Sequence, residues 1–150
     1  MRAVIQRVIK SELVIEKNIF SSINNGLLIF VGIEDADSAA DAEWLCSKII
    51  NLRIFNDENG VMNKSVLEIG AEVLIVSQFT LHASTKKGNR PSYIRAAKPE
   101  VAIPLYQKFT SLFKASMNDK VKTGVFGADM KISLTNDGPV TICIDTKNKE

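Results

Sequence analysis

The stretch from Glu72 to Leu81, EVLIVSQFTL, constrains the fold of this chain more than any other segment. Five consecutive positions from Val73 to Ser77 are apolar or small, which is typical of a buried β-strand. Polar residues then cluster at Ser77, Gln78 and Thr80, where that strand would reach the surface. In α/β folds the end of a buried strand is a common place for a ligand site. The segment therefore predicts a strong strand with a candidate site at its end.

Strand patterns also fill the first third of the chain and its C-terminal part. Residues 3–9 alternate between two faces, and the apolar run LLIFVGI (27–33) follows a turn at residues 24–26. Short strands are expected on both sides of a turn at residues 57–60. The remaining strand segments are ELVIE (12–16), VKTGVFG (121–127), MKISLTN (130–136) and PVTICID (139–145).

Two segments have the apolar spacing of amphipathic helices. The first is expected to run from an N-cap at Asp37 or Ser38 to about Leu52. The second is expected to begin near Pro99, and its apolar stripe would be Val101, Leu105, Phe109, Leu112 and Phe113. We therefore predict a single α/β domain over residues 1–150, with a mixed β-sheet that curls into a barrel-like core and two main helices packed on it.

Composition narrows the class of protein. The chain has 19 Lys or Arg and 17 Asp or Glu residues, so a nucleic-acid partner would need a local basic patch. Only Cys46 and Cys143 are present, both expected to be small buried hydrophobes, which favours a reducing, cytoplasmic setting. The N-terminal residues lack the apolar stretch of a signal peptide, and residues 27–33 are too few to span a bilayer. We expect no membrane partner.

The common catalytic motifs are missing from the sequence. His82 is the only histidine, and with two distant cysteines it does not make a zinc site, so neither a metal nor an organic cofactor is expected. There is no phosphate-binding glycine motif and no nucleophile elbow. One interpretation pairs Thr80 with His82, two positions along the same strand, as a hydrolytic pair. The other is a capped strand end without chemistry.

Two further segments each have two interpretations. Lys86, Lys87, Arg90, Arg95 and Lys98 lie around Gly88 and Tyr93, in either a solvated loop or a surface for phosphates or a stacked base. Residues 136–139, Asn-Asp-Gly-Pro, lie between two strand patterns. They would make either a tight turn, with a trans peptide bond by base rate, or a rigid backbone feature displayed to a ligand.

The motifs in combination resemble a known family. SQFTL (77–81) and NDGPVT (136–141) resemble the two signature motifs of the D-aminoacyl-tRNA deacylases. Four other segments are similar to that family in the same order, so that the resemblance covers essentially the whole chain: QRV (6–8), RIFND (53–57), GNRPSY (88–93) and TGVFGADM (123–130).

The resemblance implies a homodimer with active sites at its interface and the 3′ aminoacyl end of tRNA as partner. Gly138 and Pro139 would form a cis element that enters the pocket of the other subunit, and Arg7 would hold its backbone. The pocket for the aminoacyl ester would be lined by Ser77, Gln78, Phe79 and Thr80. The wall for the terminal adenosine would include Phe126 and Met130.

The reaction implied is hydrolysis of the ester bond of D-aminoacyl-tRNA, and of mischarged glycyl-tRNA, assisted by the ribose 2′-OH. An L side chain would point into the Pro139 carbonyl, so rejection of L-aminoacyl groups would follow from a clash. Two alternatives from other classes stay open. One is a non-catalytic tRNA-binding module, and the other is an ordinary ester hydrolase built on Thr80 and His82.

Overall fold

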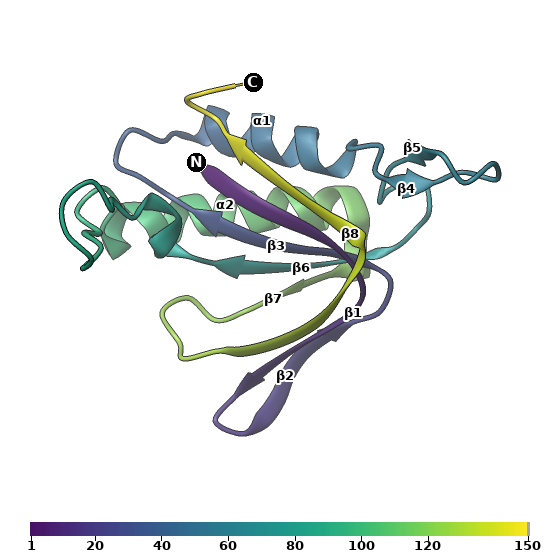
Figure 1. The fold of residues 1–150 in the computed structure, drawn as a ribbon, viewed down its shortest axis with the longest axis horizontal. Helices are drawn as coiled ribbons and strands as arrows, with labels where there is room; N and C mark the ends of the chain where they lie inside the picture. Colours follow the sequence, from purple (N-terminus) through teal and green to yellow (C-terminus); the bar gives the residue numbers. More distant parts are fainter. Residues whose placement is uncertain (150) are drawn as a thin grey trace.

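A long, strongly curved mixed sheet forms the body of the molecule in the computed structural model, which describes residues 1–149 (Figure 1). Two helices, α1 (Ala39–Ile50) and α2 (Pro99–Met117), pack against each other and against the sheet. The sheet strands are β1 (Arg2–Ile15), β2 (Asn18–Ile23), β3 (Gly26–Gly32), β6 (Glu72–Ser77), β7 (Val121–Thr123) and β8 (Lys131–Asp145). A small separate hairpin is made by β4 (Phe55–Asn56) and β5 (Met62–Lys64).

The strand order explains the curl of the sheet. The order is β2-β1-β3-β6-β7, with β8 on the other edge of β1. β1 pairs with β3 through residues 2–8 and with β2 through residues 11–15, so this one strand belongs to both halves of the sheet. The Ser21 hydroxyl donates a hydrogen bond to the Thr123 carbonyl at 2.9 Å, which brings β2 toward β7. The sheet is therefore nearly closed, and the predicted barrel-like α/β domain is confirmed.

Strand β6 is buried on both of its faces, as its sequence predicts. Val73 and Ile75 belong to the apolar cluster under the helices, whereas Leu74 and Val76 belong to a second cluster inside the curl. Its neighbours β3 and β7 are both parallel to it. Full burial of such side chains contributes roughly 1.5–3 kcal/mol each. This burial fixes the position of the strand end that carries Ser77.

The predicted helices are present, with one correction to their faces. Ser38 is the N-cap of α1, in a capping box with Asp41. In α2 the predicted stripe is partly wrong, because Val101 is 38% exposed and the neighbouring Ala102 is buried instead. The reason is visible one turn later, where the Tyr106 hydroxyl donates to the Ile75 carbonyl at 3.0 Å and turns that side of the helix toward β6. The buried set is Ala102, Tyr106, Phe109, Thr110, Phe113 and Met117.

Other predicted elements also differ from the structure, and the strand predicted at residues 121–127 ends at Thr123. The strand predicted up to Leu81 ends at Ser77, and residues 79–82 form a 3-10 helix, η1 (Phe79–His82). The two strands predicted around the Asn-Asp-Gly-Pro turn are one strand, β8, which bulges there instead of turning. Cys46 is buried as expected, but Cys143 is exposed because it points away from the core, whereas its neighbours Ile142 and Ile144 pack against the core.

Candidate functional site

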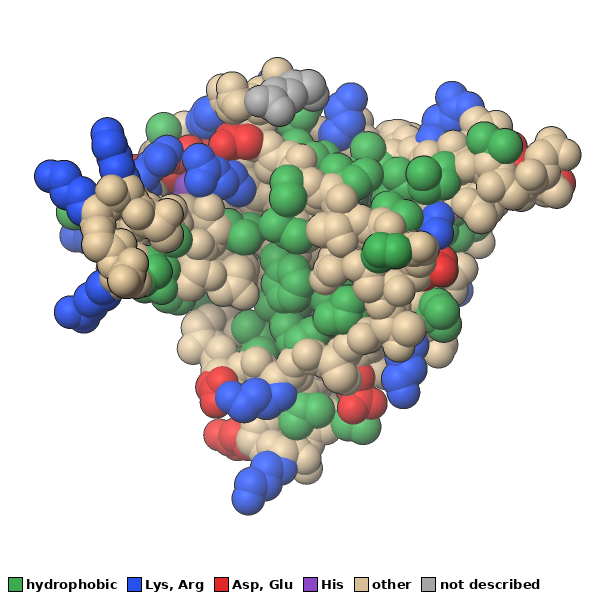
Figure 2. Space-filling view, viewed as in Figure 1, with side chains coloured by type: hydrophobic (Ala, Val, Ile, Leu, Met, Phe, Trp, Pro, Cys, Tyr) green, Lys and Arg blue, Asp and Glu red, His purple; other side chains and the backbone are tan. Residues whose placement is uncertain are grey.

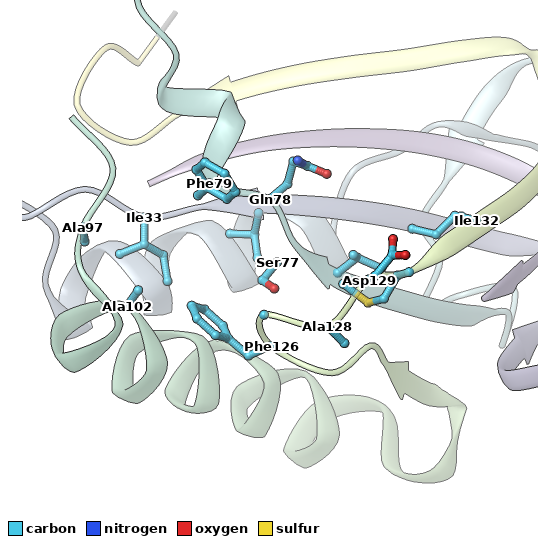
Figure 3. A pocket seen from close by; sticks show the side chains of 14 residues that line it. Ile33, Ser77, Gln78, Phe79, Ala97, Ala102, Phe126, Ala128, Asp129 and Ile132 are labelled. Carbon is cyan, nitrogen blue, oxygen red and sulfur yellow. The ribbon is translucent and has the colours of Figure 1, made fainter. Parts of the chain in front are cut away.

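A cavity of about 310 Å³ opens where β3 and β6 end and α2 begins (Figure 3). Its floor is apolar, with Ile33 from the end of β3 and Ala102 from the first turns of α2. The loop of residues 126–130, between β7 and β8, forms the opposite wall. Strand ends, a helix start and a distant loop thus meet at one hollow, the kind of place where α/β proteins bind ligands.

Three residues of the SQFTL segment line this cavity. Ser77 is the last residue of β6, and the Gln78 N–H still donates to the Val31 carbonyl at 2.8 Å. The chain then turns into η1, which exposes 56% of the Phe79 side chain. Thr80 is not among the lining residues, and its hydroxyl accepts a hydrogen bond from Gln78 Nε2 at 2.6 Å. The Thr80 hydroxyl is therefore engaged by Gln78 and does not face the cavity.

The β7–β8 loop supplies Phe126 and Met130 to the same cavity, and their role toward the terminal adenosine stays a prediction. The Phe126 ring packs against Tyr106 of α2, with the ring centroids 5.9 Å apart. Burial raises the pKa of Tyr106 to about 12, so its hydroxyl stays a neutral donor to the Ile75 carbonyl. Phe126 is thus supported from behind by a fixed aromatic ring and presents a wall to the cavity (Figure 3).

Some lining residues were not singled out from the sequence. They are small or apolar side chains from β3, β6, α2 and its preceding loop, and their spacing alone carries no functional signal: Val31, Ile33, Val76, Ala97 and Ala102. Asp129 also borders the cavity, and its carboxylate forms an ion pair with Lys131 at 2.7 Å. Ser77, Gln78, Phe79, Phe126 and Met130 are the predicted residues that the structure brings together.

Gly138, Pro139 and Arg7 lie outside this cavity. The pairing of β8 with β1 passes from Asn136 opposite Val8 to Thr141 opposite Gln6, so residues 137–140 have no partners in the ladder. The Gly138–Pro139 peptide bond in this bulge is cis, and both residues are exposed. Their insertion into a second subunit stays a prediction.

Arg7 packs against the Gly138–Pro139 bulge. Its side chain is buried, with Nη1 donating to the Ile54 carbonyl at 2.6 Å and Nε lying 3.0 Å from an Asp137 carboxylate oxygen. Its Nη2 atom would lie 3.0 Å from a Cβ atom added at Gly138. The guanidinium therefore fits directly against the glycine backbone and leaves no room for a side chain there.

His82 does not serve as a base for Thr80. The predicted strand neighbours are instead in a 3-10 helix, and His82 is 0% exposed on the side packed against Gly32. Both ring nitrogens lack a hydrogen-bond partner among residues 1–149. The imidazole is a buried neutral group under the site, and the ester hydrolase built on Thr80 and His82 loses its base.

This burial predicts a pH dependence of stability. Desolvation lowers the pKa of His82; contact with the Gly32 backbone and the Glu34 and Asp37 carboxylates partly restore it, and the Arg2 guanidinium lowers it slightly further. The unfolded chain, with an ordinary histidine pKa of about 6.5, therefore binds the proton more readily. We expect the free energy of unfolding to fall by up to about 1.4 kcal/mol per pH unit below that value.

The measurement is urea unfolding between pH 7.5 and 5, repeated with His82→Phe. The His82→Phe variant should lose the histidine contribution to the slope of the unfolding free energy against pH. The contributions of the other titrating groups should remain. An identical slope in both proteins would contradict the assignment of the acid sensitivity to His82.

The chemistry available in the cavity is limited. Among residues 1–149 no group of three or more His, Cys, Asp or Glu side chains is placed to hold a metal ion. The Ser77 hydroxyl has no histidine or carboxylate as a hydrogen-bond partner in the described chain. Within residues 1–149, none of the helices combines the length and the hydropathy that a membrane-spanning segment requires.

These features define a class of protein: a small α/β domain with a curled sheet, a cavity at its strand ends and no nucleophile–base pair in that cavity. A family model described as D-Tyr-tRNA(Tyr) deacylase matches residues 4–145. The chain therefore belongs to the D-Tyr-tRNA(Tyr) deacylase family and is a hydrolase that acts on ester bonds.

Individual relatives agree over the full length. Proteins named D-aminoacyl-tRNA deacylase from Bacteroides fragilis strain YCH46 and Flavobacterium psychrophilum are each 63% identical to this chain, with all of both chains covered. A solved structure named c-Myc DNA Unwinding Element Binding Protein is 37% identical, with a TM-score of 0.92 over 97% of this chain and 98% of that one. A structure described as a probable eukaryotic D-amino acid tRNA deacylase is 17% identical and shares the fold, with a TM-score of 0.82 over 95% and 97% of the two chains.

Proposed function

We propose that this protein hydrolyses the ester bond between a D-amino acid and the 3′-terminal adenosine of tRNA. The observation that carries the proposal is the cavity, where the SQFTL segment meets Phe126 and Met130 from a segment about fifty residues away. Full-length relatives at 63% identity carry the name of this activity. A cytoplasmic location, where aminoacyl-tRNA is used, fits the proposal.

An ester that is already activated can be hydrolysed at a site without a nucleophilic side chain. In our proposal water attacks the carbonyl carbon, the neighbouring ribose 2′-OH assists it, and the 3′-oxygen leaves with a proton. The protein then has to position the ester and stabilise the oxyanion. The backbone N–H groups of Phe79 and Thr80 are the candidate donors, because they precede the first bond within η1, which Leu81 donates to the Gln78 carbonyl at 3.3 Å.

The Gly138–Pro139 bulge would complete the site of a second subunit in a homodimer. β8 is an edge strand of 15 residues in which no residue of the bulge or its flanks is fully buried. Figure 2 shows hydrophobic side chains gathered in the middle of the face on which β8 lies in Figure 1. Long exposed edges and contiguous apolar patches are frequent sites of association with another chain. A second copy would cover them here.

Selectivity would then come from the bulge carbonyls. The carbonyl groups of Gly138 and Pro139 would accept hydrogen bonds from the α-ammonium group of the substrate. An L side chain would point into the Pro139 carbonyl, whereas a D side chain would point away and glycine would be accepted. The protein would therefore reject L-aminoacyl groups by a steric clash and show little preference among D side chains.

The test of the function is release of amino acid from D-tyrosyl-, L-tyrosyl- and glycyl-tRNA. We expect cleavage of the D and glycyl substrates and none of the L substrate. Equal cleavage of both tyrosyl enantiomers would remove the chiral filter. Binding of tRNA without any cleavage would favour the non-catalytic module instead.

A substitution at Thr80 separates this mechanism from nucleophilic catalysis. Because its hydroxyl only accepts a hydrogen bond from Gln78, Thr80→Ala should leave the backbone donor in place and merely free the Gln78 amide. We expect kcat on D-tyrosyl-tRNA to fall by no more than about tenfold, the effect of one ordinary hydrogen bond. Single-turnover measurements that show complete loss in a folded variant would make Thr80 the nucleophile.

A further inference from the structure

The loop of residues 84–98 extends beyond the cavity and carries five cations and no acidic side chain. Its tip is closed by two backbone hydrogen bonds between Ser84 and Ser92, of 2.8 and 3.0 Å. Its second end is tied to the sheet by the Ala97 N–H, which donates to the Ile33 carbonyl at 2.9 Å. Backbone hydrogen bonds therefore give this connection between η1 and α2 a defined conformation.

The cations of this loop are almost all free. Arg95 lies 3.6 Å from the Glu34 carboxylate, and it is the one member with an ion pair in the described chain. The exposed side chains of Lys86, Lys87, Arg90 and Lys98 make no ion pair or hydrogen bond with residues 1–149. Figure 2 shows Lys and Arg side chains projecting at the end of the molecule where this loop lies in Figure 1. Unpaired cations on one projection attract polyanions.

The loop is also connected to the mouth of the cavity. Tyr93 makes an edge-to-face contact with Phe79, with ring centroids 5.1 Å apart, and Phe79 lines the cavity. Ala97, at the end of the loop, lines the cavity as well. Ile94, between Tyr93 and Ala97, is 88% exposed. Apolar and aromatic side chains therefore lie between the cavity and the cations of the loop. Single-stranded nucleic acid is commonly bound by such a combination of rings and cations.

We propose that the loop of residues 84–98 is the docking surface for the tRNA acceptor arm, with Lys86, Lys87 and Arg90 contacting backbone phosphates beyond the 3′-terminal nucleotide. This inference rests on the proposed function, because it requires an aminoacylated 3′ end in the cavity. Contacts to phosphates do not depend on the base sequence, so they would add affinity for every tRNA alike. They would act on KM and leave the chemical step unchanged.

The test compares the triple variant K86Q/K87Q/R90Q with wild type on D-tyrosyl-tRNA between 50 and 200 mM salt. Each lost phosphate contact lowers the slope of log affinity against log salt by about 1. We expect the slope of log KM to fall by about 3 and KM at 50 mM salt to rise at least tenfold, with kcat within about twofold of wild type. The control is K114Q/K120Q/K122Q, which removes the same charge from α2, from the 3-10 helix η2 (Asn118–Lys120) and from β7, and should match wild type.

A second substrate distinguishes the possible failures. D-tyrosyl-adenosine lacks the acceptor arm, so wild type and the triple variant should cleave it equally. An unchanged KM and salt slope for the triple variant on tRNA would overturn the docking surface while the deacylase function stands. Equal losses in both triple variants would also overturn it, because they would reflect overall charge. Wild type that cleaves neither substrate would remove the proposed function itself.

Discussion

Gly138→Ala is expected to lower kcat/KM on D-tyrosyl-tRNA by about 100-fold or more, since misplacement of a positioning group by about 1 Å has effects of that size. Gly138 has a φ of +117°, which L side chains rarely adopt. An added Cβ would lie 2.9 Å from Val140 Cγ2 and 3.0 Å from Arg7 Nη2. Arg7 is buried and bonded to the Ile54 carbonyl, so it cannot yield easily. The bulge must move, and with it the carbonyl groups proposed to bind the substrate.

A matched glycine separates this effect from backbone strain alone. Gly60 lies in the turn between β4 and β5, has a φ of +77° and would place a Cβ with nothing within 4 Å. Gly60→Ala should lower the free energy of unfolding by about 1–2 kcal/mol and leave kcat/KM unchanged. Thermal unfolding and deacylation are measured for both variants. Normal activity of a folded Gly138→Ala protein would contradict a role for the bulge.

The sequence predicted the body of this fold because its strands and helices have strong patterns. The apolar run of β6 is buried on both faces, and the change of period from Asp37 onward predicts the first helix, whose N-cap is Ser38. The end of β6 could not be predicted, because the polar residues Gln78 and Thr80 are compatible with either a strand or a turn. The difference lies in a tertiary contact: η1 packs directly on Gly32, where an added Cβ would lie 3.0 Å from Leu81 Cβ and from His82 Cδ2.

The residues of the candidate site also differ in how far the sequence could predict them. Ser77 and Gln78 stood out because polar side chains follow a buried strand, whereas Phe126 and Met130 carried no signal apart from the family resemblance. The bulge was ambiguous for a physical reason, since Gly and Pro favour a turn and an interrupted ladder alike. Because β1 continues as the partner of β8 on both sides of residues 137–140, the chain continues as one strand and does not reverse direction. That information is not local to the motif.

Ala102→Phe is expected to reduce deacylation about as strongly as Gly138→Ala, by filling the cavity. Ala102 is 5% exposed on the first turns of α2, and its side chain borders the cavity of about 310 Å³ (Figure 3). A phenyl ring there occupies space that the aminoacyl end needs. Because the ring enters an existing hollow, the variant should unfold within a few degrees of wild type. A folded variant with full activity would show that the substrate binds elsewhere.

Mixing these two inactive variants is expected to restore activity. The Gly138→Ala chain keeps an intact cavity, and the Ala102→Phe chain keeps an intact bulge, so one of the two sites in each mixed dimer would be whole. Equal amounts that exchange freely give about half mixed dimers, and activity should recover to about 25% of wild type. The comparison is each variant alone at the same total concentration, with dimers verified by mass. Recovery requires that the bulge of one subunit serves the cavity of the other. A mixture no more active than its components would mean that each chain carries its own complete site, and that Gly138 acts only within its own subunit.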